Sequence, residues 1–304
     1  MFARSLHLFL ASTALLAASA FGDAPATQTP PAAEVPAAPT PAPDGAETMA
    51  ERRLKDISEH QKVLFADAAA QGESLDEPGF TTQVEQLTRE YESLLRDNPK
   101  FAAGYASYGY MLWKIGLRKQ SVAILLKANQ MDPDIPLVKN ELGNYLAEEG
   151  KPLEALNYFL AAIKLEPNEP LYHYQLGTLL YEARDDFLKS GEWTRAAIDH
   201  SMLEAFGHAA QLAPDRLEFT YRYAESFYDM VDPDWAAALK AWQGMEAKAP
   251  TPVERETMRL HQANVLMNMG KDDQARKVLD HVVDPTLAEQ KQKLIARLQE
   301  DGGK

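Results

Sequence analysis

The chain has 304 residues and a formal net charge of −14, from 31 basic and 45 acidic side chains. It contains no cysteine, which excludes disulfides and thiolate chemistry. An acidic chain without a basic stripe is a poor ligand for nucleic acid and gains nothing from an anionic membrane surface, so we expect neither as a partner.

Residues 1–20 have the three-part layout of a secretory signal peptide. Arg4 makes a basic start, a mostly apolar stretch follows, and Ala18-Ser19-Ala20 offers an A-x-A cleavage site. The apolar run is too short for a comfortable membrane span. We therefore expect cleavage, export to the periplasm or the medium, and no stable membrane span afterwards. Retention of the leader as an N-terminal anchor is the alternative.

Residues 21–46 form a Pro/Ala-rich stretch that we predict to be a disordered linker. Between Asp23 and Ala46 it holds seven prolines and no aromatic residue, leucine or isoleucine. Such a composition cannot bury enough apolar surface to fold. The interpretation we favour is a solvated tail without a binding role. A spacer, or a ligand for a proline-reading groove, is the other interpretation.

The folded part begins with two helices, predicted over Thr48–Ala70 and Thr82–Arg96 and separated by a break at Gln71–Gly79. Both carry apolar residues along one face. Together, residues 48–99 constitute a hairpin with an enlarged turn, as is typical of a degenerate terminal repeat.

Residues 102–135 and 136–169 are two copies of one 34-residue unit. Each copy carries a glycine in its first half, Gly109 or Gly143, and later a small residue followed four positions on by a large one. Small side chains let two helices approach closely, and the large one fills the space between them, which predicts a helical hairpin. The hairpins are bounded by three prolines 34 residues apart: Pro99, Pro133 and Pro167.

This pattern resembles the tetratricopeptide (TPR) repeat, with its Leu-Gly pair, later A-x3-F and closing proline. The resemblance covers roughly residues 48–300 and implies an all-α fold, a right-handed α-α superhelical solenoid of about six TPR-like helical hairpins plus a C-terminal capping helix. One hairpin cannot bury its apolar face alone, so neighbours must stack. Gly116 and Gly150 are expected to end the first helices with a positive φ.

The fourth repeat, residues 170–216, contains a 13-residue insertion that lengthens its hairpin. Ser190-Gly191 is the predicted turn, with Ser190 as a candidate cap for the returning helix. The insertion carries Phe187, Leu188 and Trp193, which form a candidate second docking patch. The interpretation we favour is that these side chains pack on one another or on the adjacent repeat.

The array continues through a fifth repeat at 217–252, with a lengthened turn at Asp232-Pro233-Asp234, and a sixth at 256–285. A polar helix at 286–300 has apolar residues on one side only. This one-sided pattern suits a cap that solvates the end of a solenoid over 47–300.

No pattern in the sequence indicates catalysis, a metal or a cofactor, and we predict none of the three. The histidines make no H-E-x-x-H or other two-ligand helical pair. No glycine-rich phosphate loop follows a strand, since no convincing strand is present. The abundant acidic pairs are expected to be solvated.

In TPR proteins the first helices line a concave groove, at fixed offsets from the glycine. Aromatic rings there bury much area yet keep a polar handle, which favours peptide binding. Some of the rings are expected to fill gaps between repeats instead. The offsets imply the following groove residues: Tyr110, Trp113, Lys114, Asn140, Asn144, Tyr174, Tyr181, Tyr221 and Tyr228.

One TPR subtype is excluded. TPR domains that clamp a C-terminal carboxylate carry a lysine three residues before the glycine, where this chain has Ala106, Asn140 and Tyr174 in its successive repeats. We therefore predict a non-enzymatic scaffold or adaptor of the cell envelope that binds a peptide or protein surface in its groove. The alternatives are a solute-binding or carrier protein with a small ligand in the aromatic groove, and an enzyme.

Overall fold

The computed structural model describes residues 47–301, and all regular secondary structure in that range is helical. The predicted leader at 1–20 and linker at 21–46 lie outside the described residues. Contacts divide the chain into two compact units, unit 1 (residues 1–142) and unit 2 (residues 143–304), which are treated separately below. The prediction of one continuous array over 47–300 stays a prediction.

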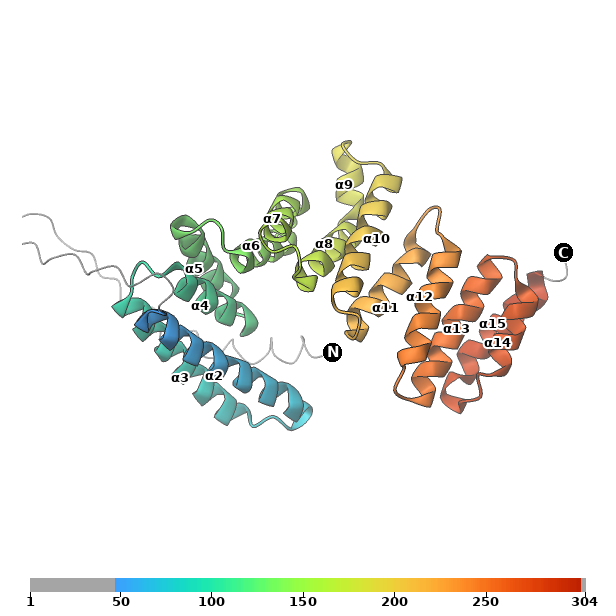
Figure 1. The fold of residues 1–304 in the computed structure, drawn as a ribbon, viewed down its shortest axis with the longest axis horizontal. Helices are drawn as coiled ribbons and strands as arrows, with labels where there is room; N and C mark the ends of the chain where they lie inside the picture. The colour runs from blue at the N-terminus through green and yellow to red at the C-terminus, as the bar shows by residue number, and fades with distance from the viewer. Residues whose placement is uncertain (1–46, 302–304) are drawn as a thin grey trace, which may run out of the picture. The chain divides into compact units, whose positions relative to one another are not determined.

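Unit 1 consists of helical hairpins. Helices α2 and α3 lie side by side, and α4 packs against α5 (Figure 1). Helix α6 opens the next hairpin and contains the division between the units. The helices span Met49–Gln71 (α2), Glu77–Asp97 (α3), Ala102–Lys114 (α4), Arg118–Met131 (α5) and Pro136–Glu148 (α6), with a short 3-10 turn, η2, at Gly72–Ser74.

Unit 2 also consists of helices that pack in pairs. Helix α8 packs against α10, and α12 packs against α13. Its helices span Pro152–Leu165 (α7), Pro170–Glu182 (α8), Arg184–Ser190 (α9), Arg195–Leu212 (α10), Leu217–Ser226 (α11), Trp235–Lys248 (α12), Pro252–Asn268 (α13), Asp272–Asp280 (α14) and Ala288–Asp301 (α15). Two 3-10 turns accompany them, η3 at Phe227–Asp229 and η4 at Pro285–Leu287.

Glycines bring the helices of a hairpin together, as the repeat pattern predicts. A Cβ added to Gly109 would lie 2.7 Å from the side chain of Leu125. A Cβ on Gly143 would come within 2.9 Å of the Phe159 ring. Because Leu125 and Phe159 are buried, each large side chain occupies the space that its glycine leaves empty.

The predicted helix ends are also confirmed at two turns. Gly116 and Gly150 follow α4 and α6 with φ of 81° and 72°, values that L side chains rarely adopt. The second helix of the first hairpin, however, begins at Glu77, five residues before its predicted start. The reason is a cap, because the Asp76 side chain accepts a hydrogen bond from the backbone N–H of Gly79.

The insertion does not simply lengthen both helices of the fourth hairpin. Helix α8 ends at Glu182 like a regular first helix, and the added residues make the separate helix α9 and the first part of α10. The turn at Gly191 is as predicted, with φ of 76°. The cap of α10 is Thr194 and not Ser190, since the Thr194 side chain accepts from the N–H of Ala197.

Candidate functional site

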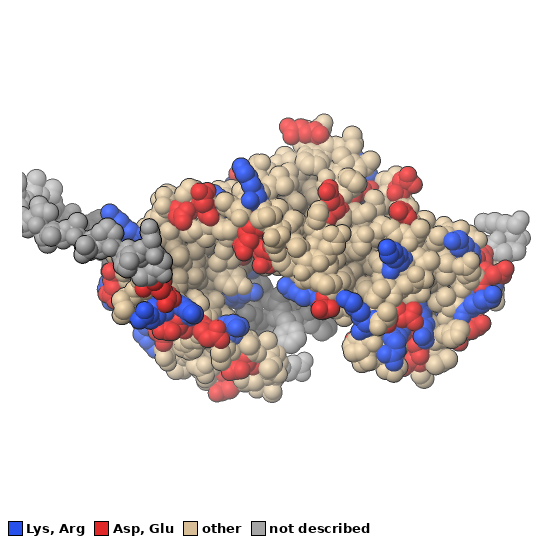
Figure 2. All heavy atoms as spheres, viewed as in Figure 1, with Lys and Arg blue, Asp and Glu red and all other residues tan. Residues whose placement is uncertain are grey.

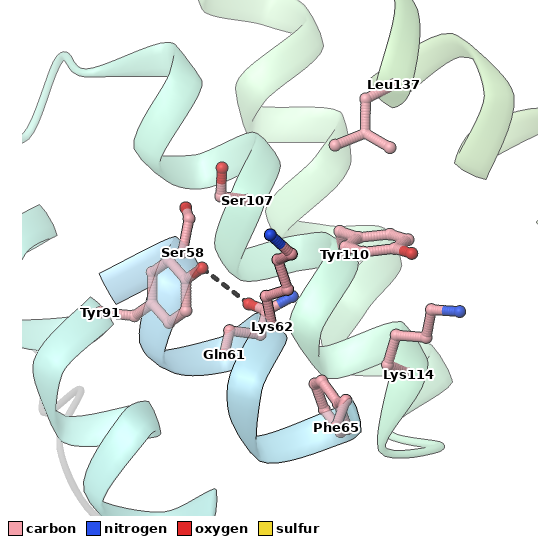
Figure 3. Close-up of a pocket in the computed structure, with 9 residues that line it drawn as sticks. All are labelled: Ser58, Gln61, Lys62, Phe65, Tyr91, Ser107, Tyr110, Lys114 and Leu137. Atoms are coloured by element: carbon pink, nitrogen blue, oxygen red, sulfur yellow. Dashed lines mark hydrogen bonds between the residues drawn. The ribbon is translucent and has the colours of Figure 1, made fainter. Parts of the chain in front are cut away.

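Unit 1 contains a pocket of about 430 Å³, which joins residues of the degenerate first hairpin to residues of the first regular repeat and to Leu137 at the start of the second. Its walls come from α2, α3, α4 and the start of α6 (Figure 3). The lining residues are Ser58, Gln61, Lys62, Phe65, Tyr91, Ser107, Tyr110, Lys114 and Leu137. Two of the predicted groove residues, Tyr110 and Lys114, are therefore brought together here.

A buried amide is held in one orientation at the base of this pocket. Gln61 is only 8% exposed, and its Oε1 accepts a hydrogen bond of 2.7 Å from the Tyr91 hydroxyl. Burial raises the pKa of Tyr91 to about 12, so this hydroxyl remains a donor at neutral pH. With Oε1 occupied by the tyrosine, the Nε2 amide group of Gln61 is turned toward the pocket (Figure 3).

The α2 side of this pocket is absent from the sequence prediction, which treats α2 only as an amphipathic cap. The signal that could have revealed it is a polar residue in an apolar stripe. Gln61 follows Ile57 by one helical turn and precedes Leu64 by one, and all three are buried. A glutamine at such a position needs a hydrogen-bond partner or a ligand.

The remaining groove residues of unit 1 do not line the pocket. Trp113 is half-buried, and the Arg118 guanidinium covers one face of its ring at 3.7 Å from the centroid. Asn140 is fully buried and its Nδ2 donates to Glu141 Oε1 at 3.0 Å. The side chain of Asn140 is thus enclosed by the protein, and its part in partner binding stays a prediction.

In unit 2, the predicted groove residues Tyr174 and Tyr181 differ in exposure. The half-buried ring of Tyr174 packs on Phe206 and Phe219, with centroid distances of 5.6 and 4.8 Å. Tyr181 is 38% exposed and carries the Arg222 guanidinium 3.9 Å from its ring centroid. Asn144, at the start of unit 2, is half-buried. Tyr181 is therefore the more accessible of the two rings.

Tyr221 and Tyr228 belong to a cluster around His261. The His261 ring stacks on Trp242 with centroids 3.9 Å apart. The Tyr221 hydroxyl lies 3.0 Å from His261 Nε2, and that of Tyr228 donates to the His261 carbonyl oxygen. Both tyrosines are half-buried, and both hydroxyls form hydrogen bonds within the protein. This matches the expectation that some groove rings fill gaps between repeats.

The candidate docking patch of the insertion is internal rather than exposed. Phe187 is fully buried, and the ring of Trp193 lies 5.6 Å from it in an edge-to-face arrangement. Leu188 and Trp193 are partly buried against the same core cluster, and α9 contacts α7, α8 and α10. The geometry supports packing on one another and on the neighbouring repeat, the interpretation favoured from sequence.

A second, larger pocket of about 960 Å³ lies in unit 2 and was not expected from the sequence. Helices α10, α11, α12 and α13 contribute its walls, which include Ala210, Tyr223, Ala241, Met245 and Met258. Most of these side chains are small or apolar. None of the predicted groove residues lines it.

Over 47–301, no three histidine or carboxylate side chains are grouped as metal ligands, and no helix is both long and apolar enough to cross a bilayer. On the face shown in Figure 2, acidic and basic side chains are scattered in small groups over both units.

No protein-family model and no curated protein matches this sequence, but solved structures match its fold. YrrB, described as a TPR protein with an unusual peptide-binding site, is 16% identical with a TM-score of 0.53, covering 67% of this chain and 97% of YrrB. PilF of Pseudomonas aeruginosa is 14% identical with a TM-score of 0.51, covering 80% and 99% of the two chains. PilW, a type IV pilus biogenesis factor, is 12% identical with a TM-score of 0.51, covering 82% and 100%. This chain therefore has the all-α helical-hairpin fold of tetratricopeptide-repeat proteins, which its own repeats predict.

Proposed function

We propose that this protein is a non-enzymatic scaffold or adaptor that binds a peptide or protein surface through a concave groove lined by the first helices of its hairpins. The pocket of unit 1 carries the proposal, because Tyr110 and Lys114 from the predicted groove meet Phe65 and Gln61 there around an open cavity. Aromatic walls with a few fixed polar groups are typical of binding sites. The printed description of YrrB, a TPR protein with a peptide-binding site, supports a peptide as ligand.

We propose further that the protein works in the cell envelope after export. The signal-like leader at 1–20 supports this location, and so does the fold similarity to PilW, a pilus biogenesis factor. Nucleic acid is not proposed as a partner, because the chain is acidic.

A solute-binding or carrier role is the second candidate. The observation in its favour is the size of the two pockets, about 430 and 960 Å³, which fall within or near the range of small-ligand sites. Native mass spectrometry of the purified protein separates the two functions, since a carrier would retain a bound molecule of small mass.

The groove is tested by capture of the native partner from envelope extract, with the bound proteins measured by mass spectrometry. Trp113→Ala and Tyr181→Ala remove aromatic groups that we expect to anchor the partner. Loss of such an anchor commonly costs about 2 kcal/mol, or roughly a thirtyfold loss of affinity. Each variant should lose capture while its helical signal and cooperative melting are retained.

Trp193→Ala in the insertion is the comparison variant. It should capture the partner normally once its own fold has been verified by circular dichroism, because Trp193 packs inside the hairpin. Loss of capture by Trp193→Ala together with normal binding by both groove variants would show that the insertion, and not the groove, holds the partner.

A further inference from the structure

The pocket of unit 1 has a charge opposite to that of the chain. Its lining contains two ammonium groups, Lys62 from α2 and Lys114 from α4, and no carboxylate (Figure 3). The whole chain, in contrast, has a net charge of −14. A site with cationic walls on an acidic protein attracts an anionic ligand and disfavours a cationic one.

Neither lysine is neutralised by a strong ion pair. Lys62 Nζ lies 3.6 Å from a Glu59 carboxylate oxygen, but both side chains are well exposed, at 77% and 65%. Such a surface pair contributes little energy and exchanges readily with another carboxylate. Lys114 Nζ lies 5.3 Å from the centroid of the Tyr110 ring, and no carboxylate in the described part of the chain pairs with it.

Gln61 adds a neutral donor to the same pocket, next to Lys62 (Figure 3). Its carbonyl oxygen is held by Tyr91, so its Nε2 amide group faces the pocket, and no acceptor within residues 47–301 is bonded to it. The Gln61 side chain is mostly buried, but its Nε2 is not one of the fully buried, unpaired polar atoms of the described residues, so it meets the solvent of the pocket. An acceptor on a ligand can therefore replace water on this donor.

The rest of the wall is apolar. Phe65 and Tyr110 present rings to the cavity, and Leu137 adds an aliphatic side chain (Figure 3). A ligand that fits must therefore combine anionic acceptors with an apolar group. Two separate ammonium groups suit two carboxylates, whereas the end of a peptide chain supplies only one.

We propose that the pocket of unit 1 binds a stretch of a partner in which two acidic side chains flank an aliphatic or aromatic one, with Lys62 and Lys114 facing the carboxylates and Gln61 donating to one of them. The proposal rests on the function proposed above and specifies the chemistry of the partner. It adds an α2 side to the groove that the repeat pattern predicts.

The experiment is a peptide selection on the immobilised full chain. One library displays random octapeptides inside a loop of a carrier protein, so that none has a free carboxyl terminus, and a second library displays them at the carrier's C-terminus. We expect the internal library to become enriched in Asp and Glu next to an aliphatic or aromatic residue. A selected peptide, capped at both ends, and its Glu-to-Gln version are then compared by fluorescence anisotropy.

Variants assign the selected peptide to the pocket. Lys62→Gln and Lys114→Gln should each weaken binding about tenfold, as expected for loss of a charged hydrogen bond. Gln61→Glu keeps an acceptor for the Tyr91 hydroxyl but replaces the inward donor by a carboxylate, and should weaken binding at least as much. The matched control is the double variant Lys55→Gln/Lys119→Gln, which removes two exposed charges of the same unit outside the pocket and should bind normally.

Several outcomes would overturn the proposal. They are enrichment only in the C-terminal library, equal enrichment of neutral or basic peptides, no enrichment, or equal binding by the pocket variants and the control. If the Trp113→Ala and Tyr181→Ala proteins still lose their native partner, the scaffold function stands and only the acidic chemistry is wrong. If both variants bind that partner normally, the proposal that the partner binds in the groove is wrong.

Discussion

His261 shows how a side chain with no recognisable motif acquires a defined chemical state. In unit 2 it stacks on the fully buried Trp242 and contacts the hydroxyl of Tyr221. Burial lowers the pKa of His261 to about 4, because the charged imidazolium would lose its hydration there. The ring is therefore neutral at pH 7 within an aromatic cluster.

This lowered pKa predicts an acid-sensitive stability. In the unfolded chain His261 becomes protonated below its ordinary pKa of about 6.5. In the folded chain the same ring stays neutral until the pH falls to about 4. The stabilising effect of a neutral His261 is thus complete above pH 6.5 and is lost as the pH falls from 6.5 to 4. At pH 5 the loss is roughly 1–2 kcal/mol by this linkage.

The measurement is urea unfolding of wild type and His261→Gln at pH 7 and pH 5. Gln keeps an acceptor for Tyr221 but does not titrate, so the variant should lose less stability on acidification than wild type does. Equal losses in the two proteins would mean that His261 is solvated and that its pKa is ordinary.

In three hairpins, a glycine on the first helix faces a large side chain on the second: Gly109 faces Leu125, Gly143 faces Phe159 and Gly177 faces Phe206. Gly143→Leu in α6 should clash with the Phe159 ring, because even a Cβ at that position would come within 2.9 Å of it. Phe159 is fully packed, so the helices must move apart. Overpacking of this kind costs about 1–3 kcal/mol. We expect thermal melting by circular dichroism to fall by several degrees.

Gly244→Ala in α12 is the matched control. A Cβ at Gly244 meets nothing within 4 Å, and alanine is the better helix former by about 0.5–1 kcal/mol. The control should therefore melt at the same temperature or higher. If Gly143→Leu melts like wild type, the assumed contact between these helices is not a determinant of stability.

The insertion in the fourth repeat is tied to the next repeat by a buried carboxylate. Asp199 in α10, only 2% exposed, accepts from Arg195 Nε at 2.7 Å and from the backbone N–H of Val231 at 3.1 Å. Arg184 Nε lies 3.3 Å from the same carboxylate. A buried charge is tolerated only with such partners, so the network holds α9 and α10 against the turn that follows η3. The inserted residues of α9 and α10 thus stabilise the contact between the fourth repeat and the fifth.

At the scale of the whole molecule, the testable feature is the processing of the N-terminus. Expression in a bacterial host with residues 1–20 intact should produce a mature chain that begins at Phe21, because cleavage is expected after the A-x-A site. Intact-mass or Edman analysis measures this directly. Soluble cytoplasmic protein that retains the leader would contradict export.

The repeat architecture follows from the amino-acid sequence alone. A 34-residue spacing of glycine, small, large and proline residues is local and periodic, so it specifies helix lengths, turns and the contacts inside each hairpin without any knowledge of distant residues. Gly109 opposite Leu125 and Gly143 opposite Phe159 are the contacts that this periodicity predicts. The turn glycines follow for the same reason, since only their backbone conformation is required.

Which side chains remain accessible to a ligand depends on how the helices pack in three dimensions. Tyr110 and Tyr221 are both predicted groove residues, yet Tyr110 lines a pocket and the Tyr221 hydroxyl is hydrogen-bonded to His261. Accessibility depends on helix rotation and on the residues that the next repeats bring near, which a one-dimensional period does not encode. The pocket joins Gln61 of the first hairpin to Tyr110 of the next one. The Gln61 amide has its orientation because Tyr91, 30 residues away in the same hairpin, donates to its oxygen.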